Sequence, residues 1–236
     1  MKIPIVLYHS ISNDVSPLSL NINEFEKHII FLKKRYYKTI NFDEVNSTKN
    51  KQIIITFDDG YKDLLSDVLP ILKKYDFKAT CFVVSGLLGK KNTWDVSKKN
   101  FVPKHLMNTN DLREWIDNGM SIGSHSHNHV DLTTLKANEI NNELIYSKKF
   151  LEDKIGVNIN NFSYPYGKVN NSVYKITKQI YKKATTTNRG RFNTTKHDLH
   201  LIPRIDMGKK LSLLKIFLKL ETLYEDINFK KNELYL

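Results

Sequence analysis

Cysteine is almost absent from this sequence. Cys81 is the single cysteine among 236 residues, which excludes an internal disulfide and a zinc site built from thiolates. The residues around it, 79–84, are mostly apolar or β-branched. We therefore expect Cys81 to be a buried thiol within a strand, where it acts as a small apolar side chain.

Long apolar segments are absent as well. No apolar run approaches the roughly 18 residues that a transmembrane helix needs. The N-terminus carries one lysine, Lys2, and then only the short stretch Ile3–Leu7 before Tyr8. This stretch is too short for the core of a signal peptide and lacks a small-residue cleavage site. If Met1 is the natural start, the sequence predicts a cytoplasmic protein.

Acidic residues are outnumbered by basic ones. The chain has 37 Lys and Arg against 25 Asp and Glu, a net charge of +12 and a pI of about 9.5. The lysines are dispersed as pairs and form no dense basic tract with interleaved aromatic residues, so we predict no nucleic-acid partner. Together with the many asparagines, they indicate a compositional bias. The alternative is attraction to anionic membrane lipid or to a phosphate-bearing substrate.

The segment around 210–224 bears on the same question, because it combines apolar residues with lysines at helical spacing. We interpret it as a helix that covers the core and keeps its lysines in solvent. The alternative is a peripheral contact with a membrane or a lipid-linked sugar. The sequence does not indicate an oligomeric state.

Strand-like and helix-like segments alternate along the chain about every 30–40 residues. This alternation predicts βαβ units and a parallel sheet. Polar motifs repeatedly follow the seven or so expected strands, which favours an α/β barrel with its site on one face over a sandwich. Residues 61–75 are expected to form one helix with a kink at Pro70. Because no repeat or linker interrupts the chain, we predict one domain, 1–236.

Two adjacent acids, Asp58 and Asp59, follow the apolar run Ile53–Ile55 and precede Gly60. A run of isoleucines that ends at a turn signal is typical of a buried strand of a parallel sheet. Unpaired buried charge is very costly, so these acids require a cation, a proton or water. The carboxyl ends of parallel strands are where ligands bind and catalysis occurs.

Three of the eight histidines lie within five residues, at His125, His127 and His129. His125 and His129 meet on one side if the backbone makes a helical turn there. Two imidazoles with one carboxylate form a common catalytic zinc set that leaves one position open. We expect one divalent ion, Zn²⁺ first, with Co²⁺ or Ni²⁺ as alternatives. His127 alternates away from the other two and is expected to be exposed or to support the ligands.

Two acids beside one metal divide the work between them. One carboxylate holds the ion, and the other is left to take a proton from an activated water. The tetrahedral oxyanion that forms is stabilised by the ion and by a backbone N–H group. This arrangement predicts hydrolysis of an amide or an ester.

Three motifs occur in a fixed order: Thr56–Gly60, then His125–His129 about 65 positions later, then Ser163–Gly167. Together they resemble the polysaccharide deacetylases, carbohydrate esterase family four, whose domain is the NodB homology domain. The resemblance covers most of the chain. Its beginning, Val6–Ser10, is similar to the Tyr-His opening of the poly-N-acetylglucosamine deacetylase branch.

The resemblance implies a distorted (β/α)7 TIM-like barrel, with the active site at the C-terminal ends of the strands. It also implies metal-dependent removal of an N-acetyl group from an N-acetylated amino sugar. Asp58 would be the general base, and the metal ligands would be Asp59, His125 and His129. The substrate groove would be lined by Pro165 and by Tyr166, whose backbone N–H is the candidate oxyanion donor.

Two positions depart from the pattern of the family. Many members have an arginine two residues before Pro165, where it pairs with the base, but this chain has Ser163. We expect Arg204, just after a late strand, to supply that cation to Asp58. The usual histidine near the C-terminus, which provides the general acid, is also missing. We favour His9, at the end of the first strand, as the general acid, and the alternatives are His197 and His200.

Trp94 lies in the longest expected loop, and either stacks on a sugar ring or anchors the loop. Three alternatives to N-deacetylation stay open at this stage. The same metal site could remove an O-acetyl group or hydrolyse an amide that is not on a sugar. Because the motif arginine and the late histidine are missing, the chain could also be an inactive sugar-binding homologue.

Overall fold

The computed structural model describes residues 2–14, 16–45, 51–96 and 101–227. Its centre is a closed barrel of seven parallel strands in the order β2-β12-β10-β9-β8-β7-β6. The barrel closes because β2 pairs with β6 on one side and with β12 on the other. The bounds of these strands are β2 Ile5–Tyr8, β6 Gln52–Phe57, β7 Thr80–Val83, β8 Ser121–Ser124, β9 Asn161–Ser163, β10 Lys183–Arg189 and β12 Ile202–Asp206.

The remaining strands are short. An antiparallel pair lies near the N-terminus, a parallel pair follows β2, and one strand extends the sheet beside β6. These are β1 Lys2–Ile3 with β11 Phe192–Asn193, β3 Ser10–Ile11 with β4 Ser19–Leu20, and β5 Lys38–Thr39.

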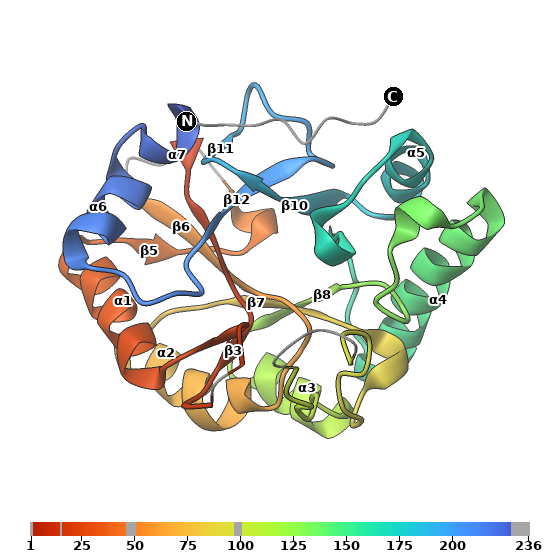
Figure 1. The fold of residues 1–236 in the computed structure, drawn as a ribbon, viewed down its shortest axis with the longest axis horizontal. Coiled ribbons are helices and arrows are strands. Elements are labelled where there is room, and N and C mark those ends of the chain that lie inside the picture. Colours follow the sequence, from red (N-terminus) through yellow and green to blue (C-terminus); the bar gives the residue numbers. More distant parts are fainter. Residues whose placement is uncertain (1, 15, 46–50, 97–100, 228–236) are drawn as a thin grey trace.

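Helices surround the barrel, as Figure 1 shows. They are α1 Ile22–Lys34, α2 Leu69–Tyr75, α3 Thr109–Asp117, α4 Ala137–Ile155, α5 Asn171–Ile180, α6 Leu213–Glu221 and α7 Tyr224–Ile227. Shorter turns are a π-helix at Leu64–Val68 and 3₁₀ turns at Phe42–Glu44, Ser85–Leu87, Leu132–Thr134 and Pro165–Gly167. Within the described ranges, no helix is both long and apolar enough to cross a membrane.

The expected (β/α)7 barrel is therefore confirmed, and its core explains why the strands are so apolar. Every residue of β2, β6 and β7 is buried, because helices cover the outside while side chains fill the inside. Tyr8 stacks on Phe57 at a centroid distance of 5.5 Å, and Phe57 meets Trp115 edge-on at 6.3 Å. Cys81 is fully buried in β7, as predicted.

The single helix expected over 61–75 is wrong in its first part. Tyr61 and Lys62 precede the helical region, which includes Asp63 and continues as the π-helix from Leu64 and as α2 from Leu69. Pro70 is the second residue of α2 and lies directly after the π-helix, where the Leu69 backbone N–H donates to the Leu64 backbone oxygen; proline has no N–H to continue that pattern. The two residues 61 and 62 instead contact a distant loop, since Tyr61 forms an isolated β-bridge with Leu106 and the Lys62 backbone N–H donates to the His105 backbone oxygen.

His28 of α1 provides a test of the packing between this helix and the barrel. Its side chain is fully buried, and its Nδ1 lies 3.1 Å from the Tyr8 hydroxyl. Burial lowers the pKa of His28 to about 4; the nearby charge of Glu24 opposes this shift, and the charge of Lys27 adds a smaller lowering contribution. The unfolded chain keeps a histidine pKa of about 6.5, so between these values the unfolded state binds more protons.

We expect the free energy of unfolding to fall by about 2.5 kcal/mol through His28 as the pH drops from 7.5 to 4.5. Urea unfolding at both pH values should show this difference between the unaltered protein and His28→Gln. The exposed His105→Gln variant is the control. An identical pH dependence in His28→Gln would contradict the assignment.

Candidate functional site

Asp58 and Asp59 leave the C-terminal end of β6 in different directions because the backbone turns sharply there. Asp59 and Gly60 both have positive φ, at 76° and 79°. At Gly60 a Cβ atom would lie 2.9 Å from Cγ1 of Val83, so both the conformation and the space require glycine. The strained turn separates the two carboxylates, so that each faces its own set of partners.

Asp59 lies between two histidine rings. Its Oδ1 is 3.4 Å from Nε2 of His125 and 3.3 Å from Nε2 of His129. Within the described part of the chain these three residues form a buried group whose ligand atoms all lie within 4.8 Å of one another. His129 reaches this position with a φ of 55°, which makes the local turn that brings it back beside His125.

The hydrogen bonding around this group fits a cation. Nδ1 of His125 is 2.7 Å from the backbone oxygen of Ser163, so Nδ1 carries the proton and Nε2 presents a lone pair. Oδ1 of Asp59 is buried without a hydrogen-bond partner. Burial alone would raise the pKa of Asp59, but its contacts with His125 and His129 hold that pKa well below the ordinary range. Two imidazole nitrogens and a carboxylate oxygen are a set that a divalent ion accepts.

Asp58 instead forms a buried ion pair with Arg204 of β12. The guanidinium donates from Nη1 to Oδ1 at 2.7 Å and from Nη2 to Oδ2 at 2.6 Å. Nη2 also donates to Oγ of Ser163 at 2.9 Å, and that hydroxyl donates to Asp58 Oδ2 at 3.1 Å. Ser163 therefore stands where the family pattern has arginine and bridges the ion pair that Arg204 makes.

The remaining donors of Arg204 are also satisfied. Nε donates to the Thr186 backbone oxygen at 3.0 Å, and Nη1 reaches Oγ1 of Thr56 at 3.2 Å. Burial raises the pKa of Asp58, but the charges of Arg204 and His125 outweigh it and hold that pKa below its ordinary value. Asp58 is thus an ionised carboxylate near neutral pH.

His9 lies on the rim of this site. It follows β2, whose last residue, Tyr8, accepts a hydrogen bond from the Asp58 backbone N–H at 3.0 Å. His9 is half-buried and lines a cavity of about 260 Å³, and the buried Arg204 lines the same cavity. The charge of His9 is also among those that lower the pKa values of Asp58 and Asp59.

The two alternative histidines lie at the other end of the barrel. Nε2 of His200 is 2.9 Å from the Tyr181 backbone oxygen, just before β10 begins. Nδ1 of His197 accepts from the Asn193 backbone N–H at 3.1 Å, beside the N-terminal residue Lys2. Both therefore face the N-terminal ends of the strands and cannot reach Asp58.

Aromatic side chains enclose His129. The half-buried Trp94 ring stacks on it at a centroid distance of 4.4 Å, and Tyr166 meets it edge-on at 4.7 Å. The Tyr166 hydroxyl is 3.5 Å from Oδ1 of Asp95. Trp94 was expected either to stack on a sugar ring or to anchor its loop. One face of its ring packs against His129, so the anchoring contact is present.

The turn after β9 holds Tyr166 in place. Pro165 is buried, and Tyr166 has a φ of 58°. Gly167 also has positive φ, and a Cβ atom there would lie 1.9 Å from Oγ1 of Thr187.

His127 points elsewhere, with its Nδ1 2.9 Å from Oγ of Ser85, so it is not part of the group around Asp59.

Sequence reasoning missed two contributors to this site. Ser163 was noted only as a missing arginine, yet its hydroxyl and its backbone oxygen contact two different members of the site. Tyr61 was assigned to a helix, although its hydroxyl accepts from Asn92 at 3.2 Å and its pKa is raised by burial and by nearby Asp59. A position at or shortly after a strand end was the available signal for both residues.

The fold and the site together place this chain among α/β barrel enzymes whose strand ends carry a carboxylate and two imidazoles, a donor set that could hold a metal ion. The protein-family model for polysaccharide deacetylase matches residues 45–184, more than half of the chain. The chain therefore belongs to the polysaccharide deacetylase family.

Individual relatives agree with this assignment. YxkH of Bacillus subtilis (strain 168) is 32% identical over 197 residues, which are 80% of this chain and 66% of YxkH. The poly-beta-1,6-N-acetyl-D-glucosamine N-deacetylase of Staphylococcus aureus (strain MRSA252) is 25% identical over 85% of this chain and 71% of that protein. The chain thus spans about two thirds of the length of these relatives.

A solved structure shares the whole fold. The Streptococcus pyogenes deacetylase PplD, in complex with acetate, superposes with a TM-score of 0.80 and 28% identity. The match covers 94% of this chain and 99% of the PplD chain.

The Arg204–Asp58 pair makes a prediction for stability. Arg204→Met leaves a buried carboxylate without its cation, which should lower the free energy of unfolding by about 3–5 kcal/mol. The double variant Arg204→Met/Asp58→Asn removes both charges and should recover most of that loss. Urea unfolding of metal-free protein measures both. If the free energy of unfolding of Arg204→Met lay within about 1 kcal/mol of that of the unaltered protein, the ion pair would not be needed for folding.

Proposed function

We propose that this protein is a metal-dependent hydrolase that removes the N-acetyl group from an N-acetylated amino sugar. The observation that carries the proposal is the difference between two neighbouring carboxylates. Asp59 lies within a buried group of imidazoles, while Asp58 is kept ionised outside that group by Arg204. A cation-binding acid beside a free base is the arrangement that hydrolysis by an activated water requires.

The ligands of the proposed ion are Asp59, His125 and His129. Zn²⁺ is the first choice, and Co²⁺ and Ni²⁺ suit the same donors. When bound, the ion would polarise the acetyl carbonyl and acidify water. Ser163 would support it by fixing the tautomer of His125 through its backbone oxygen.

Asp58 is the proposed general base. Its carboxylate takes a proton from the attacking water, and the bidentate contact with Arg204 holds both oxygens in a fixed plane. The lowered pKa keeps Asp58 in the basic form at neutral pH. Arg204 thus orients the base and keeps it ionised.

Two further residues complete the proposed reaction. The backbone N–H of Tyr166, in the left-handed turn after β9, is the proposed donor to the developing oxyanion. His9 is the proposed general acid that protonates the leaving amine. Pro165 and Trp94 would line the groove in which the sugar lies.

The substrate class follows from the family. The related Staphylococcus aureus protein is named for poly-beta-1,6-N-acetyl-D-glucosamine, and the Streptococcus pyogenes relative holds acetate. We propose an N-acetylated amino sugar within a glycan or a carrier-linked precursor of surface polysaccharide. We also propose that residues 1–236 act as one deacetylase domain.

Acetate release from a panel of N-acetylated sugars, with and without chelator, tests the function. We expect release that stops on chelation and returns with Zn²⁺, Co²⁺ or Ni²⁺. Asp58→Asn should bind metal normally but release acetate about 10²–10⁴-fold more slowly, because it lacks the base. Asp117→Asn, at an exposed acid, is the control. No release from any sugar by fully loaded protein would contradict the proposal, and release only from O-acetyl esters would favour an esterase.

The role of His9 has a separate test that depends on the leaving group. An amine must be protonated as it leaves, whereas para-nitrophenolate leaves without a proton. His9→Ala should therefore lose about 10²-fold or more in kcat on an N-acetylated sugar and keep its rate on para-nitrophenyl acetate. Equal losses on both substrates would remove His9 from the role of general acid.

A further inference from the structure

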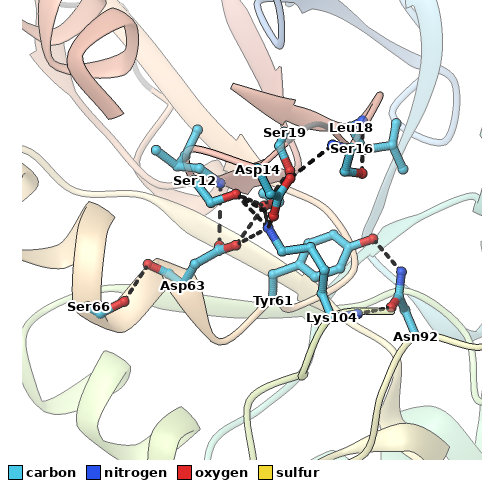
Figure 2. A network of polar contacts seen from close by, with 12 residues as sticks. Ser12, Asp14, Ser16, Leu18, Ser19, Tyr61, Asp63, Ser66, Asn92 and Lys104 are labelled. Atoms are coloured by element: carbon cyan, nitrogen blue, oxygen red, sulfur yellow. Dashed lines mark hydrogen bonds and ion pairs between the residues drawn. The ribbon is translucent and has the colours of Figure 1, made fainter. Parts of the chain in front are cut away.

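Beside the proposed active site, the ammonium group of Lys104 is enclosed by oxygen atoms from distant parts of the chain (Figure 2). The Lys104 side chain is only 11% exposed. Its Nζ lies 2.7 Å from Oδ2 of Asp14 and 2.8 Å from Oδ2 of Asp63. It also donates to three hydroxyl groups, those of Ser10, Ser12 and Ser19.

These partners come from different loops at the C-terminal end of the barrel. Ser10, Ser12, Asp14 and Ser19 belong to the segment that follows β2, and Asp63 belongs to the segment that follows β6. Lys104 itself belongs to the connection between β7 and α3. One buried ammonium therefore holds three neighbouring loops together, and each of them carries a proposed site residue.

A nucleophilic role for Ser10 beside Lys104 does not fit this geometry. Ser10 is only 1% exposed, and its hydroxyl donates to Oδ2 of Asp63 at 2.6 Å. The ammonium lies between two carboxylates and donates to them, which is the contact of a cation and not of a general base. The cluster is suited to holding loops in place and not to chemistry of its own.

His9 is the proposed site residue that this arrangement restrains most directly. On one side, Tyr8 accepts a hydrogen bond from the Asp58 backbone N–H at 3.0 Å. On the other side, Ser10 contacts Lys104 and Asp63, and the Ile11 backbone N–H donates to Oδ1 of Asp63 at 3.3 Å. The backbone of His9 is thus held from both neighbours.

Lys104 also contacts the other wall of the site. Its backbone N–H donates to Oδ1 of Asn92 at 2.6 Å, and Asn92 donates to the Tyr61 hydroxyl at 3.2 Å. Its Nζ lies 5.7 Å from the centroid of the Tyr61 ring. Asn92 is two residues from Trp94, which stacks on His129.

We propose that Lys104 is a positioning residue that holds the loop carrying His9 against the segment carrying Asp58, so that acid and base keep their separation during deacetylation. The proposal rests on the proposed function, since it acts through His9. Without the ammonium, Asp14 and Asp63 lose their shared cation, and the loop after β2 loses the contact that joins four of its polar side chains.

Hydrogen exchange tests the holding of the loop without any substrate. We expect the amides of Ser10, Ile11 and Ser12 to exchange about 10-fold faster or more in Lys104→Met, because their hydrogen bonds to Leu18, Asp63 and Leu20 open more often. Asp14→Asn, which keeps the Asp63 contact, should give a smaller increase and serves if Lys104→Met fails to fold. The control is Lys62→Met, whose ammonium is exposed and 3.6 Å from Asp111. Unchanged exchange in both Lys104→Met and Asp14→Asn would overturn the proposal.

Kinetics then tests whether the loop acts through His9. Lys104→Met should lower kcat on an N-acetylated sugar by about 10-fold or more and change the rate on para-nitrophenyl acetate by less than about 2-fold. Its metal dissociation constant, measured by competition with a chromophoric chelator, should match that of the unaltered protein. In the His9→Ala background, Lys104→Met should cause no further loss.

The outcomes of the two experiments are separable. A full additional loss in the double variant, or equal losses on amide and ester, would show that Lys104 does not act through His9. If the unaltered, metal-loaded protein released no acetate from any N-acetylated sugar, the proposed function would fail and the role in deacetylation would fail with it. Hydrogen exchange would still decide whether Lys104 holds the loop.

Discussion

The bidentate ion pair between Arg204 and Asp58 is the interaction on which the rest of the site depends. Both side chains are buried inside the barrel, where removing two charges from water costs several kcal/mol for each. Such a pair persists only when every other donor and acceptor has a partner, and here Thr56, Ser163 and Thr186 supply them. These partners lie on β6, β9 and β10. The ion pair that keeps Asp58 ionised therefore forms only when the barrel has closed and has brought these strands together.

The same closure explains how two adjacent acids have different chemistry. Asp58 continues the direction of β6 into the barrel interior, while the positive φ of Asp59 turns the next carboxylate toward His125 and His129. Burial would raise both pKa values, and in each case a different set of neighbours lowers it again. Separate environments for neighbouring carboxylates are how one site holds both an ion ligand and a base.

Much of this could be predicted from the sequence because the signals were local. A strand end followed by acids or histidines can be read from adjacent residues, and parallel strands bring their carboxyl ends to one face. That reasoning located Asp58 and Asp59, and the resemblance to the deacetylases, with Ser163 in the place of the usual arginine, led to the prediction that Arg204 reaches Asp58. The reasoning from strand ends favoured His9 as the general acid because His9 follows the first strand, but it could not exclude His197 and His200, since that depends on which end of the barrel each loop occupies. The contacts of His200 with Tyr181 and of His197 with Asn193 are visible only once the strands are placed.

Tyr61 and Lys62 show a second limit, because the apolar spacing over 61–75 suggested one continuous helix. What keeps these residues out of the helix lies far along the chain. The Lys62 backbone N–H donates to the His105 backbone oxygen at 2.9 Å, and Tyr61 forms an isolated β-bridge with Leu106. Polar contacts between loops thus override local propensity where they bind several groups at once. The barrel interior fixes the base and the candidate metal ligands, whereas the surrounding walls are set by such loop contacts. Substitutions of polar residues in these loops can therefore alter the walls of the substrate groove and leave the buried Arg204–Asp58 pair intact.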